Sequence, residues 1–401
     1  MKVLVLNAGS SSQKISLYEL GDTLPKDPLA PLWETSIDWT NRAGTSRHNQ
    51  HQTPGHQRLP STSHANALKQ VLGTLWSGPG RVLEHPEEID VIGHRVVHGG
   101  PAYRQSTLVT TEVKAAIEEY AVFAPLQNPV NLEGMRVGEE LLPGAKQVAV
   151  FDTAFHRTLP LPAIVYPGPY AWYEQGLQRY GFHGINHQYC AHRTARLLGR
   201  DLKQLKLVTC HLGYGCSLAA IRHGWSIDTT MGLTPLEGLM MGSRSGSLDP
   251  GLLLYLLQHT NVTPQQLDET LNHQSGLKGI AGRSGDMRDI LQARKEGDTR
   301  ATLAFEMYVH RLRECLGAMV AVLGGLDALV FTGGVGENAP DVRAAMCETL
   351  AFLGVSLDMQ KNTAAAGDQD IATSSSRVPV LVIHAEEDWA IANECWQLTG
   401  S

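Results

Sequence analysis

Short hydrophobic runs recur along the chain, and most of them end abruptly in glycine, serine or another polar residue. The runs are rich in Val, Ile and Leu, as strands buried on both faces of a sheet are. The expected strands are Val3–Leu6, Ile89–Ile92, Gln147–Phe151, Leu205–Thr209, Ala328–Phe331 and Val378–Ile383. Because each run is short and bounded by turn-forming residues, the pattern indicates strands rather than buried helices.

Between these runs lie segments whose apolar residues recur every three or four positions, the period of an amphipathic helix. The expected helices are Leu68–Leu75, Glu112–Val122, His187–Leu198, Leu252–His259 and Thr302–Val322. Strands that alternate with helices in this way predict an α/β fold.

Two polar stretches interrupt this alternation, and both are rich in loop-forming residues. Thr40–His64 and Lys361–Ser376 are therefore expected to be exposed loops. The first stretch carries four histidines, but no cysteine or carboxylate lies at ligand spacing from them. We interpret them as solvated loop histidines rather than a metal site: His48, His51, His56 and His64.

Length and composition narrow the class of protein. A chain of 401 residues exceeds what one hydrophobic core usually serves, so two domains are expected. A net charge of -7 offers no general attraction for nucleic acid or an anionic membrane. The six cysteines are irregularly spaced, as in proteins of the reducing cytosol, and no export signal or membrane segment is visible. We expect a folded cytoplasmic protein.

Three turns share one plan, in which an apolar strand runs into a turn containing Gly, Ser or both. They lie in "VLVLNAGSSSQKISLYEL", "KLVTCHLGYGCSLAAIRHG" and "ALVFTGGVGEN". Such turns present backbone N–H groups and let a phosphate approach closely. The repetition predicts a nucleotide cleft between two duplicated halves. The usual P-loop is absent, as is a Rossmann fingerprint after the first strand, which argues against those two folds.

Several charged residues follow predicted strands or lie in glycine-rich turns. Arg95 follows a buried strand, where a guanidinium meets either a bound anion or a neighbouring carboxylate. Asp152 stands at a strand's carboxyl end, as a ligand-binding residue or a helix N-cap. Arg244 lies in a Gly/Ser loop, as a mobile anion clamp or a surface arginine. His183 is flanked by Phe182 and a glycine, which favours function over a core role.

In order along the chain, the motifs resemble those of the acetate kinase family. They are "NAGSSSQK", "HRVVHGG", "FDTAFH", "YGFHG", "HLGYGCSL", "GLMMGSRSGSLDPG", "GGVGEN" and a closing "EE", and they run from Asn7 to Glu387. The resemblance implies the actin, sugar kinase and 70-kDa heat-shock superfamily, with two duplicated actin-like (ribonuclease H-like) domains closing on a nucleotide cleft. The first domain would cover 1–152 with the terminal helix 385–401, and the second 153–384.

The resemblance also implies roles for individual residues. Asn7 and Glu387 would hold Mg²⁺ or Mn²⁺, Arg95 and Arg244 would hold acetate and the phosphoryl group, and His183 would stabilise the transition state. A small pocket for the acetate methyl group would be formed by Val97, Leu126, Phe182 and Pro235. The residues expected around ATP or ADP are Asn7, Ser10, Ser12, Lys14, His211, Leu212, Gly213, Tyr214, Gly215, Asp286, Met287, Arg288, Gly334, Val335, Gly336, Glu337 and Asn338.

Three positions depart from the family pattern. Gln127 stands where a histidine is usual, Tyr214 where an asparagine is usual, and Ser247 where an aspartate is usual. Gln127 can still donate a hydrogen bond to a phosphate. Tyr214 removes an amide near the nucleotide phosphates and adds a ring, so the nucleotide preference is open.

The activity implied is reversible transfer of the ATP γ-phosphoryl group to acetate, which gives acetyl phosphate and ADP, in a homodimer. A carboxylate is already deprotonated at pH 7 and needs no general base, so we expect Asp152 to orient the metal ion or its waters. One alternative is a kinase for propionate or another short-chain acid. A remote alternative is a non-catalytic ATP-dependent clamp of the same superfold, which would have no use for Arg95, Arg244 and a small apolar pocket.

Overall fold

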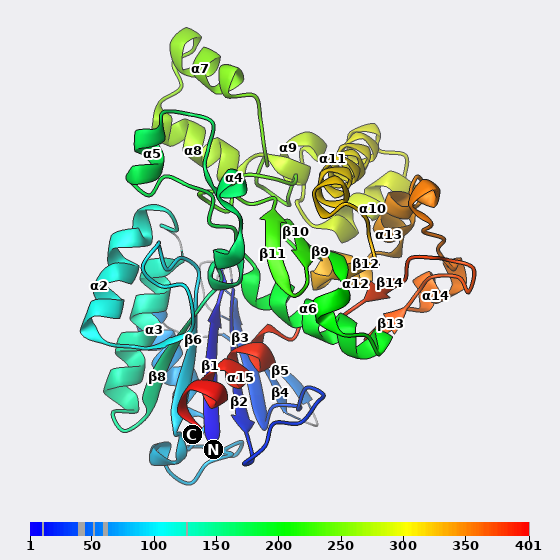
Figure 1. Ribbon diagram of the computed structural model, residues 1–401. Helices are drawn as coiled ribbons and strands as arrows, with labels where there is room; N and C mark the ends of the chain where they lie inside the picture. Colours follow the sequence, from blue (N-terminus) through cyan, green and yellow to red (C-terminus); the bar gives the residue numbers. More distant parts are fainter. Residues whose placement is uncertain (10–11, 39–44, 51–52, 59–62, 126, 401) are drawn as a thin grey trace. The chain divides into compact units, whose positions relative to one another are not determined.

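The chain forms two compact units, each built around one mixed sheet. The structure is a computed structural model, and it describes residues 1–9, 12–38, 45–50, 53–58, 63–125 and 127–400. Unit 1 comprises Met1–Phe155 and Glu386–Ser401, and unit 2 comprises His156–Ala385 (Figure 1). The chain therefore leaves unit 1, completes unit 2 and returns to unit 1.

The sheet of unit 1 has the strand order β5-β4-β3-β2-β1-β6-β8-β7. Its strands are β1 (Lys2–Ala8), β2 (Ser12–Glu19), β3 (Trp33–Asp38), β4 (Thr45–Gln50), β5 (Thr53–Arg58), β6 (Val91–Val96), β7 (Thr107–Leu108) and β8 (Lys146–Phe151). The central strands β1, β6 and β8 are parallel, and their neighbours towards both edges are antiparallel. The carboxyl ends of the three central strands therefore meet at one edge of the sheet.

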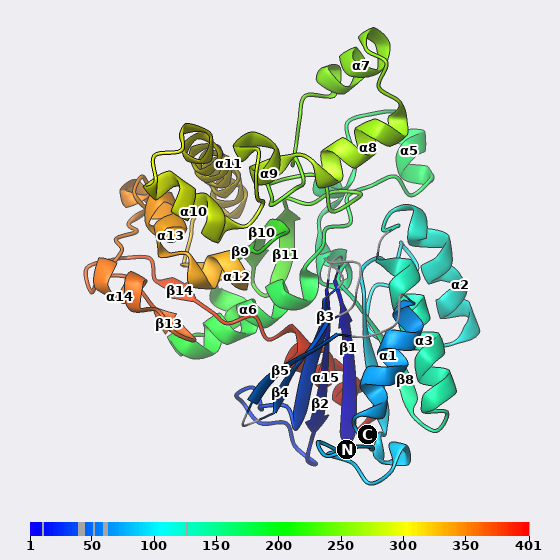
Figure 2. The same ribbon diagram turned by 180° about the vertical axis from the view of Figure 1, so that it is seen from behind.

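Helices cover both faces of this sheet. They are α1 (His64–Gly73), α2 (Thr111–Glu119), α3 (Asn128–Leu141) and α15 (Glu387–Thr399), with 3-10 turns at Pro86–Glu88, Tyr120–Val122 and Ala154–Thr158. One core joins α1 and α3 to the sheet through residues such as Leu68, Val137 and Ile15. On the other face, a Cβ at Gly93 would lie 2.6 Å from Sγ of Cys395, so this glycine allows α15 to pack closely. Figure 1 has α15 in front of the sheet, and Figure 2, from behind, has α1 in front.

The sheet of unit 2 has the order β11-β10-β9-β12-β14-β13. Its strands are β9 (Lys206–Leu212), β10 (Cys216–Arg222), β11 (Trp225–Thr229), β12 (Ala328–Thr332), β13 (Gln369–Asp370) and β14 (Val380–Val382). In both units the first strand pairs with an antiparallel hairpin partner on one side and a parallel strand on the other. The two sheets thus repeat one topology, as the repeated sequence motif predicted, and the hairpin β4–β5 extends only the first.

Eleven helices of unit 2 are described. They are α4 (Leu161–Ile164), α5 (Tyr170–Glu174), α6 (Gly184–Leu198), α7 (Pro250–His259), α8 (Pro264–His273), α9 (Gly276–Ala281), α10 (Met287–Lys295), α11 (Thr299–Leu323), α12 (Gly333–Asn338), α13 (Pro340–Cys347) and α14 (Met359–Ala364), with 3-10 turns at Leu202–Gln204 and Ala351–Leu353. Cys190 of α6 packs on Val330 and Leu381 of the sheet. The hydroxyl of Tyr308, on α11, lies 3.3 Å from Sγ of Cys216. Because neighbouring strand residues face opposite sides, α6 and α11 cover opposite faces.

Every strand and helix predicted from the apolar pattern is present, but the two predicted loops are only partly loops. Thr45–Gln50 and Thr53–Arg58 form the antiparallel hairpin β4–β5, and α14 and β13 occupy part of the second stretch. An edge hairpin is held by backbone hydrogen bonds and needs no run of apolar side chains, so its polar sequence resembled a loop. His51 lies outside the described residues, and the prediction of a solvated loop histidine is wrong for His64, which begins α1 and lies 3.2 Å from the Glu133 carboxylate.

Within the described part of the chain, no helix has both the length and the apolar character needed to cross a membrane.

Candidate active site

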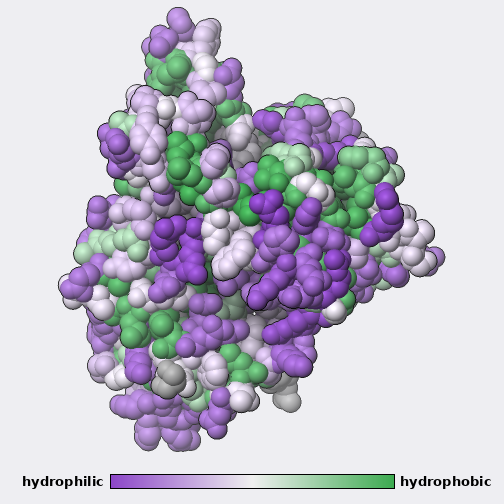
Figure 3. Space-filling view, viewed as in Figure 1, coloured by the Kyte–Doolittle hydropathy of each residue, from purple (hydrophilic) through white to green (hydrophobic). Residues whose placement is uncertain are grey.

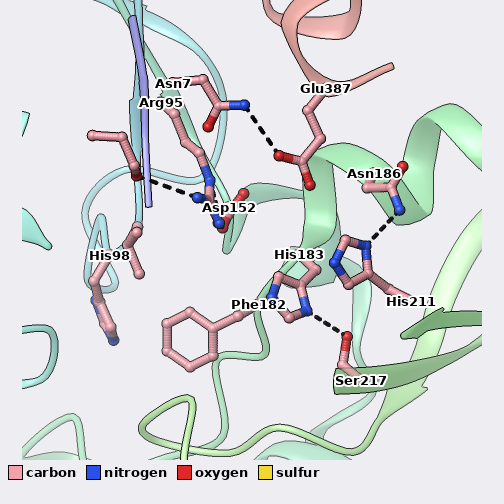
Figure 4. Close-up of polar contacts among 12 residues, drawn as sticks. Asn7, Arg95, His98, Asp152, Phe182, His183, Asn186, His211, Ser217 and Glu387 are labelled. Atoms are coloured by element: carbon pink, nitrogen blue, oxygen red, sulfur yellow. Dashed lines mark hydrogen bonds and ion pairs between the residues drawn. The ribbon is translucent and has the colours of Figure 1, made fainter. Parts of the chain in front are cut away.

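The carboxyl end of β1 and the first turn of α15 form a polar cluster in unit 1. The Asn7 amide nitrogen donates to Oε2 of Glu387 at 3.2 Å and to Oδ1 of Asp388 at 2.7 Å. The Ser16 hydroxyl donates to the other oxygen of Asp388 at 2.8 Å. Figure 4 shows the Asn7 amide nitrogen directed at Glu387, with its oxygen turned away. Residues from the two ends of the sequence therefore present oxygen atoms at one place.

Asp388 is the buried member of this cluster. Burial raises the pKa of its carboxyl above the usual value, and the charge of Lys14 and the hydrogen bonds from Asn7 and Ser16 oppose that rise. Lys14 and Ser12 are exposed on β2, and Ser10 lies outside the described residues. Sequence reasoning named Glu387 and missed Asp388, although the two are adjacent in "EED".

The donors at this edge fit a magnesium ion that shares its coordination with substrate. Among the described residues, no cluster of three or more His, Cys, Asp or Glu side chains could hold a metal by itself. Mg²⁺ is usually bound through one or two carboxylates, with substrate phosphates and water as its other ligands. The carboxylate of Glu387 matches that requirement, and the Asn7 amide, whose nitrogen donates to Glu387 in this structure, would turn its oxygen to the ion.

Arg95 and Asp152 form an ion pair where β6 and β8 end side by side. Nε and an η-nitrogen of Arg95 donate to the same Asp152 oxygen at 3.1 and 2.5 Å, and the guanidinium also donates to the Ala8 carbonyl at 3.3 Å. The side chains are 12% and 1% exposed. Burial lowers the pKa of Arg95, but the carboxylates of Asp152 and Glu387 outweigh it and raise the pKa above its usual value. Arg95 therefore meets a neighbouring carboxylate in this structure.

Two further predicted residues of unit 1 follow these strands. Val97 is buried directly after β6, and its N–H donates to Oδ1 of Asn131 at 3.3 Å. Gln127 occupies the position before α3 and makes no side-chain capping bond to that helix. Leu126, expected in the methyl pocket, lies outside the described residues.

In unit 2, His183 stands at the start of α6 in a conformation that few non-glycine residues adopt. Its φ is 57° and its ψ 23°, in the left-handed region. This conformation costs roughly 1–3 kcal/mol and is found mainly where function requires it. The ring stacks on His211 with centroids 4.1 Å apart, and Nδ1 lies 2.8 Å from the Ser217 hydroxyl. Figure 4 shows these contacts.

The rings around His183 are held by hydrogen bonds from α6 and the sheet. The Asn186 amide donates to Nδ1 of His211 at 2.6 Å, which places the His211 proton on Nε2. His187 is buried, and burial lowers its pKa well below the usual value, as do His156 and His211. The sequence reasoning missed Asn186, His187 and Ser217. Asn186 and His187 follow His183 at helical spacing, which is the signal that could have found them.

Arg244 and the turn before β10 fit closely around a glycine. The guanidinium donates to the Pro235 carbonyl at 2.6 Å. A Cβ at Gly215 would lie 2.4 Å from an η-nitrogen of Arg244 and 3.6 Å from Cε1 of His183, so Gly215 keeps both groups close. Tyr214 is 53% exposed, and its ring covers Gly242, whose added Cβ would lie 2.7 Å from it.

The third glycine turn forms the short helix α12. Gly333 has a φ of 79°, and nothing lies within 4 Å of a Cβ placed on Gly334. Glu337 is expected near ATP, and its carboxylate accepts hydrogen bonds from Gly333 and Ala385 and pairs with the His384 ring. The carboxylate is thus engaged within unit 2.

Asp286 and Arg288 lie at the start of α10. Asp286 caps the helix by accepting from the Arg288 N–H at 2.8 Å, and its carboxylate pairs with the 89% exposed guanidinium at 2.5 Å. Met287 between them is buried. Ser247, where an aspartate was expected, accepts a hydrogen bond from the Gly238 N–H at 3.0 Å.

The predicted residues therefore gather in two groups, one in each unit. Unit 1 holds the metal-type oxygens and the Arg95–Asp152 pair, and unit 2 holds the stacked histidines, Arg244 and the glycine turns. In unit 1 a guanidinium lies near carboxylates, and in unit 2 hydrogen-bond donors surround glycine turns. Both arrangements suit the binding of phosphate and carboxylate anions.

Comparison with known proteins gives one consistent result. The profile of the acetokinase family matches residues 2–393. The chain is 58% identical to "Acetate kinase" of Gloeobacter violaceus over 405 residues, which cover 99% of each chain. Among solved structures, acetate kinase of Porphyromonas gingivalis has 39% identity and a TM-score of 0.90. A propionate kinase of Francisella tularensis has 35% identity and the same TM-score, and each alignment covers 99% of both chains.

Proposed function

The chain belongs to the acetokinase family, and we propose that it catalyses reversible transfer of the γ-phosphoryl group of ATP to acetate, an ATP:acetate phosphotransferase activity. The observation that carries this is the match to acetate kinases over nearly the whole chain, at 58% identity. The two actin-like α/β units supply the fold.

The acceptor needs no activation by a base. A carboxylate oxygen of acetate attacks the γ-phosphorus, the bond to the β,γ-bridging oxygen breaks, and ADP leaves with that electron pair. Because acetate is ionised near neutral pH, no proton has to be removed. This agrees with the engagement of Asp152 by Arg95 at 2.5 Å. The task left to the protein is to bring two anions together and to stabilise the charge that spreads over the phosphoryl oxygens.

Residues of both units share this task. We propose that Arg95 binds the acetate carboxylate, that Arg244 compensates the charge on the transferred phosphoryl group, and that His183 donates a hydrogen bond to it. The glycine turns after β9 and β12 offer backbone N–H groups to the nucleotide phosphates. Asn7 and Glu387 would hold Mg²⁺, which supplies charge neutralisation between the phosphate oxygens when bound.

Acetate is the preferred acid in this proposal, and propionate is the alternative. The solved propionate kinase with a TM-score of 0.90 shows that this fold also serves an acid with one more carbon. Val97 and Phe182, both buried, and Pro235 are bulky or rigid apolar residues that would restrict the space for the acyl group.

We further propose a homodimer located in the cytoplasm. On α7 none of the residues is buried, and apolar ones such as Leu254 and Tyr255 are exposed. Figure 3 shows an apolar patch among hydrophilic side chains at the position of α7. Such a surface suits association with a second copy of the chain. All six cysteines are free thiols, as is usual in the reducing cytoplasm.

The test is an assay for acyl phosphate with trapping by hydroxylamine, using Mg-ATP and a panel of short acids. Acetate should give the highest kcat/KM, propionate a lower but measurable value, and butyrate almost none. Equal turnover of butyrate and acetate would replace this proposal with a kinase for longer acids. No acyl phosphate from any acid would exclude the activity.

A further inference from the structure

A buried hydroxyl lies between two of the histidines in unit 2. Oγ of Ser217 is 2.8 Å from Nδ1 of His183 and 2.7 Å from Nε2 of His187. A hydroxyl has one hydrogen, so Ser217 donates to one ring and accepts from the other. The proton positions on the two rings are therefore coupled.

The far end of this chain of hydrogen bonds sets its direction. Nδ1 of His187 lies 2.7 Å from Oγ1 of Thr209, and both side chains are fully buried. Among the described residues, the Thr209 hydroxyl has no hydrogen-bond partner besides His187. If His187 donated to Thr209, the threonine hydrogen would be buried without an acceptor, which is unfavourable. Donation from Thr209 to His187 avoids that cost.

Once Thr209 donates, every later proton position follows. Nδ1 of His187 is then the acceptor. The neutral His187 ring therefore carries its proton on Nε2 and donates it to the Ser217 hydroxyl. The Ser217 hydroxyl must donate to Nδ1 of His183, and the neutral His183 ring carries its proton on Nε2. Burial lowers the pKa of His187 well below its usual value, which keeps that ring neutral and able to take part.

We propose that Thr209, His187 and Ser217 are positioning residues that hold His183 in its Nε2–H tautomer, so that it meets the phosphoryl group as a neutral N–H donor. This proposal deepens the proposed function and rests on it for the role of His183. A Cβ built on Gly215 would lie 3.6 Å from Cε1 of His183 and 2.4 Å from an η-nitrogen of Arg244, so the His183 ring and the guanidinium both approach this glycine. A neutral ring there contributes a hydrogen bond without placing a second positive charge beside Arg244.

A second histidine shows the same arrangement by an independent contact. The amide nitrogen of Asn186, which can only donate, points at Nδ1 of His211, so the proton of that stacked ring is also on Nε2. Two stacked rings with the same proton placement present two neutral donors.

The first experiment needs no variant. Nitrogen-15 NMR of the histidine-labelled full chain, at a pH of about 8 where histidine is neutral, reports the tautomer of each ring. His183 is assigned from the signal lost in His183→Asn. The expected spectrum has a protonated Nε2 and an unprotonated Nδ1 for His183. A protonated Nδ1 at that site overturns the proposal, whatever the enzyme's activity.

The second experiment uses Thr209, which the proposed mechanism does not bring to substrate. Thr209→Val keeps the shape and removes the hydroxyl, so His183 should show a mixture of tautomers, and kcat should fall roughly two- to tenfold, the scale of one hydrogen bond. KM for acetate should stay the same. Thr209→Ser, which restores the hydroxyl, should restore both the single His183 tautomer and the wild-type kcat. Thr194→Val is the matched control, because Thr194 is buried on α6 and its hydroxyl has no partner among the described residues.

A third variant separates this proposal from the proposed function. Ser217→Ala removes the hydroxyl beside His183 and should lower kcat by roughly three- to tenfold with KM unchanged. If His183→Asn retains full activity while wild-type His183 shows Nε2–H, the role of His183 fails and the hydrogen-bond chain stands. If Thr209→Val and Thr194→Val give the same His183 spectrum, the chain does not control the tautomer.

Discussion

The two units differ in how their polar side chains are stabilised. In unit 1 a buried guanidinium is balanced by a buried carboxylate, with 2.5 Å between Arg95 and Asp152. In unit 2 burial lowers the pKa of His187 well below its usual value, and the rings of His183, His187 and His211 hydrogen-bond to hydroxyls and an amide. An ion pair stabilises the charged form of both side chains. In a neutral histidine ring, the hydrogen bonds instead determine which ring nitrogen carries the proton. The duplicated fold therefore carries a different kind of electrostatics in each unit.

The largest effect is expected in unit 2, at the arginine proposed to compensate the charge on the transferred phosphoryl group. Arg244 donates to a carbonyl oxygen in its Gly/Ser loop. Arg244→Ala should lower kcat by about two to five decades, the scale of arginine fingers in phosphoryl transfer. The measurement is steady-state kinetics with circular dichroism as a check on folding. The control Arg200→Ala removes an exposed arginine that pairs with Asp327 and should leave kcat unchanged. A folded Arg244→Ala variant with normal kcat would remove this residue from the mechanism.

Breaking the ion pair in unit 1 should act first on stability. Asp152→Asn leaves the Arg95 charge uncompensated, and we expect the free energy of unfolding to fall by about 3–5 kcal/mol. Urea denaturation measures this change. The double variant Arg95→Met, Asp152→Leu has no buried charge and should recover most of the loss while staying inactive. If the double variant is less stable than the single one, the ion pair stabilises the fold by more than the mutual neutralisation of its two charges.

Acidification should weaken unit 2 through its neutral histidines. Burial lowers the pKa of His156 to about 4. The hydrogen bond of His156 to the Phe182 carbonyl opposes this decrease in pKa, and the charge of Arg179 adds to it. In the unfolded chain the pKa is about 6.5, so below pH 6.5 the unfolded state binds the proton first and is favoured. Between pH 7 and 4 this group should reduce the free energy of unfolding by about 3 kcal/mol.

Denaturation curves at several pH values, compared between wild type and His156→Gln, test this slope. The variant should lose part of the pH dependence. His310→Gln, which changes an exposed histidine on α11, should keep it. Identical slopes in wild type and His156→Gln would show that His156 is not the group that titrates.

The smallest effect concerns the acyl pocket. A hydrophobic pocket discriminates by about 1–3 kcal/mol per methylene, roughly 10- to 200-fold. Val97→Ala removes two methyl groups from a buried residue and should raise the propionate-to-acetate ratio of kcat/KM by roughly two- to tenfold. Arg95→Ala, by contrast, should raise KM for acetate without favouring either acid. An unchanged ratio in Val97→Ala would show that Val97 does not line the pocket.

A structural element was predicted well from the sequence where neighbouring residues alone determine it. The strands around Val3–Leu6 and Ala328–Phe331 were predicted because a fully buried strand leaves an apolar run. The helix at Leu252–His259 was also predicted, but its spacing did not show that the structure leaves all of α7 unburied within the chain. Periodicity indicates an apolar face and does not identify what covers it.

Sequence reasoning could name candidate site residues that stand in short motifs, but it could not find partners that come from distant segments. Glu387 and His183 stand in recognisable motifs, but the contact of Asn7 with Asp388 joins opposite ends of the sequence. Ser217 and Thr209 are ordinary strand residues until β9 and β10 pair and turn both hydroxyls towards α6. Such pairings depend on strand register, which a single sequence does not specify residue by residue.

The return of the chain to unit 1 has a consequence for biosynthesis. Unit 2 is continuous, so it can finish folding on the ribosome as soon as Ala385 has left the exit tunnel. Unit 1 begins first and ends last, because its sheet lacks α15 until the segment after unit 2 has been translated. Until then the face at Gly93 has no Cys395 or Ile391 to cover it. Glu387 and Asp388 arrive with the same helix, so a nascent chain gains the edge proposed to bind the metal only when α15 docks on unit 1.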